Sequence, residues 1–251
     1  MTKSILLIGE KCIDEYVYGT CERICPEAPA ICFKSNGKIN RTAGMVGNVE
    51  KNIRVLDPSI RITTIKNPCS IVKRRFVDTK YNSIVFRVDE NDKCDPINYN
   101  SIEHGIYDAI VFSDYCKGFL QPQDIEYISN KYKDQAVQFI DTKKKIDNFI
   151  KHIDFVKINE TEYHNNKDCL QFCTNLIVTY GDKGATHYID NTTYKHYDTE
   201  KVEVRDVCGA GDTFLAGLVV KYLETENIQD SIKFANNCAR IVVSKFGVAT
   251  P

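Results

Sequence analysis

A glycine-containing turn in the second half of the chain has the residue types of an anion site. The segment Asp206-Val-Cys-Gly-Ala-Gly-Asp212 places Gly209 and Gly211 at the start of an expected helix. Backbone N–H groups at a helix start have no intrahelical partner, and the helix dipole adds about half a positive charge there. Glycines also let the backbone approach a ligand closely. The turn, with the Ala210 amide included, therefore predicts a site that stabilises a phosphoryl group in transfer.

Asp212 provides a second reactive group beside this turn. From the first helical turn, its carboxylate could accept the proton of an attacking hydroxyl, which is the role of a general base. The same residues have a simpler explanation, in which Asp206 is the N-cap of the helix and Asp212 is a favourable acid in its first turn. Taken alone, the segment leaves both explanations open.

Five apolar runs predict the strands that must hold these residues in place. The runs cover residues 5–8, 109–112, 137–140, 155–158 and 176–179. Continuous apolar runs are typical of parallel strands whose two faces are both covered by helices. In such sheets, ligands bind beyond the carboxyl ends of the strands. The pattern therefore predicts an α/β fold with its site at that edge of a mainly parallel sheet.

Two other stretches, 30–34 and 83–89, alternate apolar and polar residues and indicate a half-exposed antiparallel sheet. We interpret them as parts of a small β lid formed by segments of about 15–40 and 71–90. We expect helices at residues 46–55, 122–133, 210–223 and 228–245, the last two with apolar residues at helical spacing. No internal repeat or linker divides the sequence, so a single domain over residues 1–251 is expected.

The segment from Asp206 to Gly217 resembles the second signature of the ribokinase-like (PfkB) carbohydrate kinases, and further matches follow in the family's order. The resemblance implies a ribokinase-like fold, ATP as phosphoryl donor and Asp212 as catalytic base. Asn159-Glu-Thr-Glu162 is similar to the family's Asn-x-x-Glu, whose acid is associated with magnesium through water. Oxygen ligands of this kind suit Mg²⁺, and the family also implies a monovalent cation such as K⁺.

Further segments supply candidates for the nucleotide side of the family's site. Residues 178–184 resemble its strand-to-turn nucleotide segment, and 235–239 resemble the helix that borders the adenine pocket. Residues 141–143 resemble the Asp-Pro-Lys of a heptose-phosphate kinase group within the family, and their Lys143 could serve the nucleotide phosphates. The nucleotide-binding candidates are Asn159, Thr179, Gly181, Gly184, Asn236 and Lys143. Considered alone, the first two segments would be read as a hairpin turn and an ordinary amphipathic helix.

The first half of the chain resembles the family's sugar site. Residues 8–16 look like its opening strand, after which an aspartate binds sugar hydroxyls, and Asp14 takes that role. The family's first signature has two adjacent glycines, whereas this chain has Gly44 followed by Met45 and keeps the asparagine as Asn48. Gly44 and Asn48 are therefore sugar-site candidates, and the Met45 thioether is expected to fill space near the substrate.

The segment from Arg23 to Pro29 is similar to the Arg-Ile-Ser-Pro-Glu-Ala-Pro stretch of D-glycero-D-manno-heptose 7-phosphate kinases. Residues 113–118 resemble the same group's Ser-Asp-Tyr-x-Lys-Gly, with Lys117 as its lysine, which could bind the substrate or instead serve the nucleotide phosphates. A substrate that already carries a phosphate needs fixed cations, and Arg75 and Arg87 are the preferred pair. A solvated basic strand edge explains these two arginines almost as well.

These resemblances imply transfer of the ATP γ-phosphoryl group to a hydroxyl of heptose 7-phosphate, which would give the 1,7-bisphosphate. One alternative is a kinase for another sugar, sugar phosphate or nucleoside. The other is a catalytically silent sugar-binding or scaffold protein, which Met45 favours. We also expect a homodimer through the lid.

Composition excludes several other classes of protein. The 33 basic and 34 acidic side chains give a net charge of -1, which provides no global field for nucleic acid. No stretch approaches the roughly 18 apolar residues of a membrane span. The 11 cysteines are odd in number and lie in a long chain, which favours a reducing compartment over a disulfide-stapled secreted domain. We therefore expect a cytoplasmic protein with a small-molecule substrate.

Overall fold

The apolar runs form the middle of one large sheet in a computed structural model, which describes residues 2–69, 71–99, 102, 105–166, 168–190, 192–245 and 247–251. Within that part of the chain, the sheet has eight strands in the order β12-β11-β10-β9-β8-β7-β1-β4. They are β1 (Ser4–Gly9), β4 (Arg61–Lys66), β7 (Ala109–Asp114), β8 (Val137–Thr142), β9 (Phe155–Asn159), β10 (Leu176–Thr179), β11 (Ala185–Tyr188) and β12 (Tyr194–Tyr197). Neighbours from β4 through β10 are parallel, whereas β11 and β12 add antiparallel pairs. The predicted mainly parallel sheet is confirmed.

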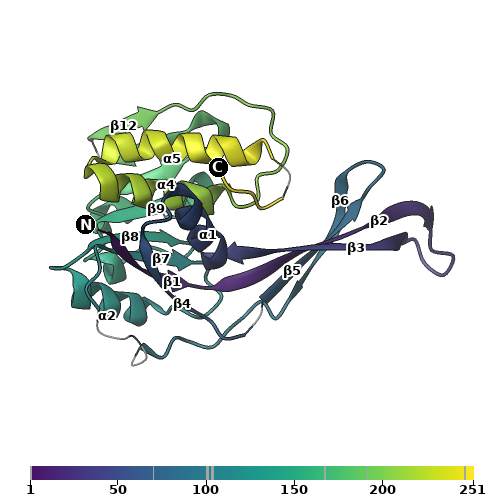
Figure 1. Ribbon diagram of the computed structural model, residues 1–251, viewed down its shortest axis with the longest axis horizontal. Helices are drawn as coiled ribbons and strands as arrows, with labels where there is room; N and C mark the ends of the chain where they lie inside the picture. Colours follow the sequence, from purple (N-terminus) through teal and green to yellow (C-terminus); the bar gives the residue numbers. More distant parts are fainter. Residues whose placement is uncertain are drawn as a thin grey trace.

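Helices cover both faces of this sheet (Figure 1). One face packs against α1 (Val46–Leu56), α4 (Ala210–Thr225) and α5 (Ile228–Val243), and the other packs against α2 (Pro122–Tyr132) and the short 3-10 helix η2 (Asn148–Ile150). Alternation along β1 divides the core, because Leu6 and Ile8 face α2 while Ile5 and Leu7 face α1 and α4. The short elements are α3 (Glu160–His164), η3 (Cys169–Phe172) and η4 (Gly181–Lys183).

A second, smaller sheet projects from the body as a long arm (Figure 1). Its strands are β2 (Lys11–Ile24), β3 (Ile31–Met45), β5 (Ile71–Asp78) and β6 (Ser83–Glu90), in the order β3-β2-β5-β6. The β2–β3 and β5–β6 pairs are antiparallel, as the alternating sequence predicted, and the central β2–β5 pair is parallel. Only Glu10 separates β1 from β2, and α1 follows β3 directly. The lid is therefore joined closely to the sheet edge where the site is expected.

Met45 lies at this junction between the lid and α1. Its φ of 55° and ψ of -133° fall where side chains are rarely tolerated, and it is the N-cap of α1. The side chain is buried in a small cluster with Cys12 and Ile71, and Tyr115 packs against this cluster. The thioether that was expected to crowd the sugar therefore packs into the base of the lid.

No helix among the described residues combines the length and the apolar character needed to cross a bilayer. The cysteine side chains are free thiols. Within the same residues, no three His, Cys, Asp or Glu side chains cluster in a way that could hold a metal ion by themselves.

Candidate active site

The glycine turn places α4 with its amino terminus at the carboxyl edge of the sheet. Gly209 is the N-cap of α4, with a φ of 79° that favours glycine, and no side chain caps this helix end. Asp206 accepts hydrogen bonds from the backbone N–H groups of Cys208 at 2.9 Å and Gly247 at 3.1 Å. The alternative with Asp206 as N-cap is therefore wrong, because this carboxylate ties the turn to the C-terminal segment. The Ala210 N–H donates to the carbonyl oxygen of Val207 at 3.3 Å, so an anion must compete for this amide.

Asp212 lies in the first turn of α4, with only 3% of its surface exposed. Its Oδ1 accepts a hydrogen bond from the Tyr115 hydroxyl at 2.6 Å, and its Oδ2 accepts one from the Asn48 amide at 3.0 Å. Burial raises the pKa of Asp212 to about 6, although these two hydrogen bonds act in the opposite direction. A carboxylate with such a pKa is suited to accept a proton near neutral pH.

Lys157 is a charged member of this site that the sequence reading missed. Its Nζ lies 2.7 Å from an Asp141 carboxylate oxygen, and its side chain is only 5% exposed. Burial disfavours the charged form of Lys157, but the attraction of the neighbouring Asp141 carboxylate outweighs this effect, so the pKa of Lys157 is raised. A Cβ added at Gly211 would lie 3.1 Å from this ammonium group, so Lys157 stands directly beside the glycine turn. A lone lysine inside the buried strand Phe155–Asn159 was the available signal.

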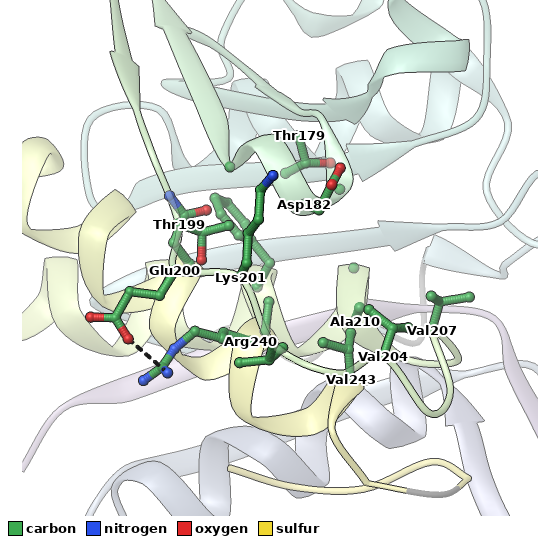
Figure 2. Close-up of a pocket in the computed structure, with 17 residues that line it drawn as sticks. Thr179, Asp182, Thr199, Glu200, Lys201, Val204, Val207, Ala210, Arg240 and Val243 are labelled. Carbon is green, nitrogen blue, oxygen red and sulfur yellow. Dashed lines mark ion pairs between the residues drawn. The ribbon is translucent and has the colours of Figure 1, made fainter.

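A cavity of about 300 Å³ lies on the outer side of the turn, between the β10–β11 connection and α5 (Figure 2). The predicted nucleotide residues Thr179, Gly181, Gly184 and Asn236 all line it, together with Ala210 and Gly211. Figure 2 shows Val204, Val207 and Val243 on one side of the cavity and the Arg240–Glu200 ion pair on another. An apolar slot with a few polar groups suits a flat heterocyclic base.

A second, more polar cavity of about 430 Å³ lies on the inner side of the turn and is also lined by Gly209 and Gly211. Lys143, Asn159 and Glu162 line it, as do Lys157 and Tyr115. The two cavities share Thr179, Gly181 and Gly211, so a nucleotide base in the first could extend its phosphates into the second.

The Glu162 carboxylate, which lines this second cavity, is held in place at the start of α3. Asn159 and Glu162 form reciprocal hydrogen bonds at the start of this helix, 2.8 and 2.9 Å long. The other Glu162 oxygen lies 3.7 Å from the Lys143 ammonium. Of the other carboxylates that line this cavity, Asp114 and Asp141 are paired with Lys144 and Lys157. The Glu162 carboxylate beside a phosphate-sized space therefore fits Mg²⁺ bound mainly through water and phosphate oxygens.

Asp14 and Gly44 lie together at the base of the lid. A Cβ added at Gly44 would stand 2.0 Å from an Asp14 carboxylate oxygen, so a side chain at position 44 would displace this acid. The buried Arg75 donates to the other Asp14 oxygen at 2.5 Å. Its guanidinium also lies over the Tyr16 ring, 5.3 Å from the centroid. The expected phosphate-binding arginine is thus paired with the expected sugar-binding aspartate.

Two other predicted cations form ion pairs of their own, although one of them, Arg87, lies opposite Arg75 on the neighbouring strand. Arg87 on β6 forms a two-pronged ion pair with Asp89, and 41% of its side chain is exposed. Lys117 pairs with Asp92. The Arg87 guanidinium and the Lys117 ammonium are therefore each paired with a carboxylate in or next to the lid.

Glu10 is a second residue that the sequence reading missed. It is fully buried, and its carboxylate accepts hydrogen bonds from the backbone N–H groups of Tyr115, Lys117 and Phe119 at 2.8, 3.1 and 3.3 Å. Burial, and then the nearby Asp114 charge, raise the pKa of Glu10. The acid therefore shapes the loop after β7 that carries Tyr115 to Asp212.

Comparison with known proteins agrees with this arrangement. Residues 128–251 match the model of the pfkB family carbohydrate kinases. The Bifunctional protein HldE of Sulfurimonas denitrificans is 29% identical in an alignment that covers 99% of this chain and 62% of the relative. That of Helicobacter pylori strain J99 is 27% identical, with 98% and 64% covered. The chain thus spans about three fifths of the length of these curated relatives.

A solved structure of similar fold is Escherichia coli phosphofructokinase-2 in complex with potassium, with a TM-score of 0.72 at 14% identity over 100% of this chain and 95% of that one. The likeness shows the fold of this chain.

Proposed function

Because this chain carries a pfkB family carbohydrate kinase domain in a ribokinase-like fold, as its sequence predicted, we propose that it phosphorylates D-glycero-D-manno-heptose 7-phosphate to the 1,7-bisphosphate. The family makes the chain a sugar kinase, a phosphotransferase with an alcohol group as acceptor, and implies ATP and a divalent cation. The heptose phosphate is supported by the Arg23–Pro29 motif and by the HldE relatives. The observation that carries the proposal is the buried Asp212 at the amino end of α4.

In the proposed reaction, Asp212 accepts the proton of the attacking sugar hydroxyl. The transferred phosphoryl group lies over the amides of residues 209–212, where the helix end favours negative charge. Lys157 adds a buried positive charge on the sheet side of this turn. Mg²⁺ associated with Glu162 through water would neutralise phosphate charge when bound, and Lys143 beside it would pair with the nucleotide phosphates.

On the acceptor side, Asp14 would bind sugar hydroxyls and Asn48 would orient both sugar and base. Arg75 supports this role by fixing the Asp14 carboxylate. For the phosphate that the substrate already carries, we propose Arg75, Arg87 and Lys117 as candidates. A substrate phosphate would compete with Asp89 for Arg87 and with Asp92 for Lys117, whereas Arg75 could bind it through its other guanidinium N–H groups while still holding Asp14.

The test is ADP formation by the purified chain with ATP, Mg²⁺ and a panel of acceptors, with and without K⁺. The panel holds heptose 7-phosphate, hexose phosphates, free sugars and adenosine. We expect heptose 7-phosphate to give the highest kcat/KM and Asp212→Asn to lower kcat about 10² to 10⁴-fold. If Asp212→Asn formed as much ADP as the unchanged chain, the enzymatic proposal would be refuted. A higher kcat/KM with another acceptor would refute the heptose assignment alone.

We also propose that the lid forms a homodimer. Phe86 and Val88 alternate along β6 and are exposed on one face of the lid, and the strand register through Val17 and Phe76 puts Ile39 of β3 on the same face. Phe86 stacks on Phe76 of the neighbouring strand. Apolar side chains gathered on one sheet face indicate a protein contact. Light scattering after gel filtration should give twice the chain mass of 28.6 kDa, and a monomer at micromolar concentration would contradict the proposal.

A further inference from the structure

Tyr115 joins the loop after β7 to the proposed catalytic base. Its hydroxyl donates to Asp212 Oδ1 at 2.6 Å across 97 residues of sequence. The backbone of Tyr115 is itself fixed, because its N–H donates to the buried Glu10 carboxylate at 2.8 Å. The reaction assigned above uses Asp212, Asn48 and the glycine turn, and it gives this tyrosine no role.

Two donors from different elements determine the plane of the Asp212 carboxylate. Tyr115 holds Oδ1, and Asn48 of α1 holds Oδ2 at 3.0 Å. The Asn48 amide is in turn oriented by Asn52, which donates to its Oδ1 at 3.0 Å. An ionised carboxylate offers about four lone-pair sites, so these bonds leave acceptor capacity for a substrate hydroxyl. A carboxylate held in one orientation meets the geometric requirement for efficient proton transfer.

The Tyr115 ring is held by cations from both sides of the site. Lys73 of the lid strand β5 lies 5.2 Å from the ring centroid, and Lys143 beside the polar cavity lies 4.9 Å from it. The ring also packs against the cluster of Cys12, Met45 and Ile71. Tyr115 thus contacts the lid, the phosphate-side lysine and the base at once.

Resting on the proposed function, we propose that Tyr115 is a positioning residue for Asp212. Its hydroxyl fixes the carboxylate and keeps it ionised, so that Asp212 can accept the proton of the sugar hydroxyl as that oxygen attacks the γ-phosphorus. Tyr115 suits this role because it stays a donor. Burial, and then the Asp212 charge, raise the pKa of Tyr115 well above its usual value, so the phenol remains protonated wherever Asp212 is ionised.

Other groups also face Asp212 and set the background for its titration. They are Asp141 of β8, Lys157 of β9 and Cys12 of β2. Asp141 raises the pKa of Asp212 and Lys157 lowers it. Because Tyr115→Phe leaves these groups in place, a change in the Asp212 titration reports the hydroxyl itself.

The experiment follows the ¹³C-carboxyl resonance of Asp212 with pH in the complete, ligand-free chain, assigned by its absence in Asp212→Asn. We expect the midpoint to rise by about one pH unit in Tyr115→Phe, since a hydrogen bond to the charged form is removed. Tyr127→Phe is the matched control, because Tyr127 is exposed on α2 and should leave the midpoint unchanged. Equal midpoints in Tyr115→Phe and the unchanged chain would overturn the proposal.

A second measurement separates this proposal from the proposed function. The acidic limb of the kcat/KM profile reports the free enzyme, so it should move to higher pH by the same amount in Tyr115→Phe. An unmoved limb would overturn the positioning role in catalysis. If the unchanged chain phosphorylated no acceptor while the resonance midpoint still moved, the Tyr115–Asp212 coupling would stand and the sugar-kinase proposal would fail. Tyr115→Met, which also lacks the hydroxyl, repeats both measurements should the phenylalanine variant misfold.

Discussion

The buried pair of Lys157 and Asp141 gives a prediction whose size follows from the structure. Lys157→Met keeps most of the side-chain volume and removes the ammonium that lies 2.7 Å from Asp141. Removing one partner of a buried ion pair costs about 3–5 kcal/mol, because the other charge is left without a partner. The side chain of Asp141 is 15% exposed, so water can reach the remaining carboxylate in part. We therefore expect a loss near the lower limit, about 3 kcal/mol in the free energy of unfolding.

The assay is urea unfolding followed by circular dichroism, with two matched variants. Adding Asp141→Asn to Lys157→Met should recover about 1–2 kcal/mol, because the unpartnered charge is gone. Lys151→Met removes an ion pair with Glu126 whose two side chains are 52% and 44% exposed, and should change stability by less than about 0.5 kcal/mol. The reasoning is refuted if Lys157→Met costs no more than Lys151→Met, or if the double variant is less stable than the single one.

Two further predictions concern activity. If Asp212 is the base, kcat/KM should rise with pH through about 6 and then level, because burial raises the pKa of Asp212 to about 6 and the base works only when ionised. A kcat/KM profile that stays flat down to pH 5 would contradict this prediction. Gly44→Ala would place a Cβ 2.0 Å from an Asp14 carboxylate oxygen, so the KM for the sugar should rise about tenfold or more while the KM for ATP stays the same. Steady-state kinetics with each substrate varied in turn measures both constants, and an unchanged KM for the sugar would contradict the prediction.

The fold was predictable because its signals are local. The buried strands are continuous apolar runs, and the helices follow apolar spacing, so β7 and α4 were expected within two residues of their observed ends. Strands β4, β11 and β12 were not expected. Strand β12 lies at one edge of the sheet and its first three residues are all exposed, so it lacks a continuous apolar run.

The site was predictable only where its residues lie within one segment. Gly209 to Asp212 and Asn159 to Glu162 are each a single turn, and their geometry follows from the start of a helix. Tyr115 reaches Asp212 across 97 residues, and Glu10 reaches Lys117 across 107. Contacts of this kind depend on strand order, which no local pattern specifies.

Met45 shows how a departure from the family's sequence pattern is accommodated by the backbone and by packing. A methionine at a φ of 55° costs about 1–3 kcal/mol in backbone strain. Burying its side chain among Cys12, Ile71 and Tyr115 contributes about 1.5–3 kcal/mol in return. Because these two terms nearly cancel, the backbone can keep the conformation that a glycine would adopt. Asn48, in the first turn of the next helix, therefore still reaches Asp212. The methionine places a flexible apolar side chain against Tyr115, so it bears on the proposed positioning of Asp212 more than on the space for a sugar.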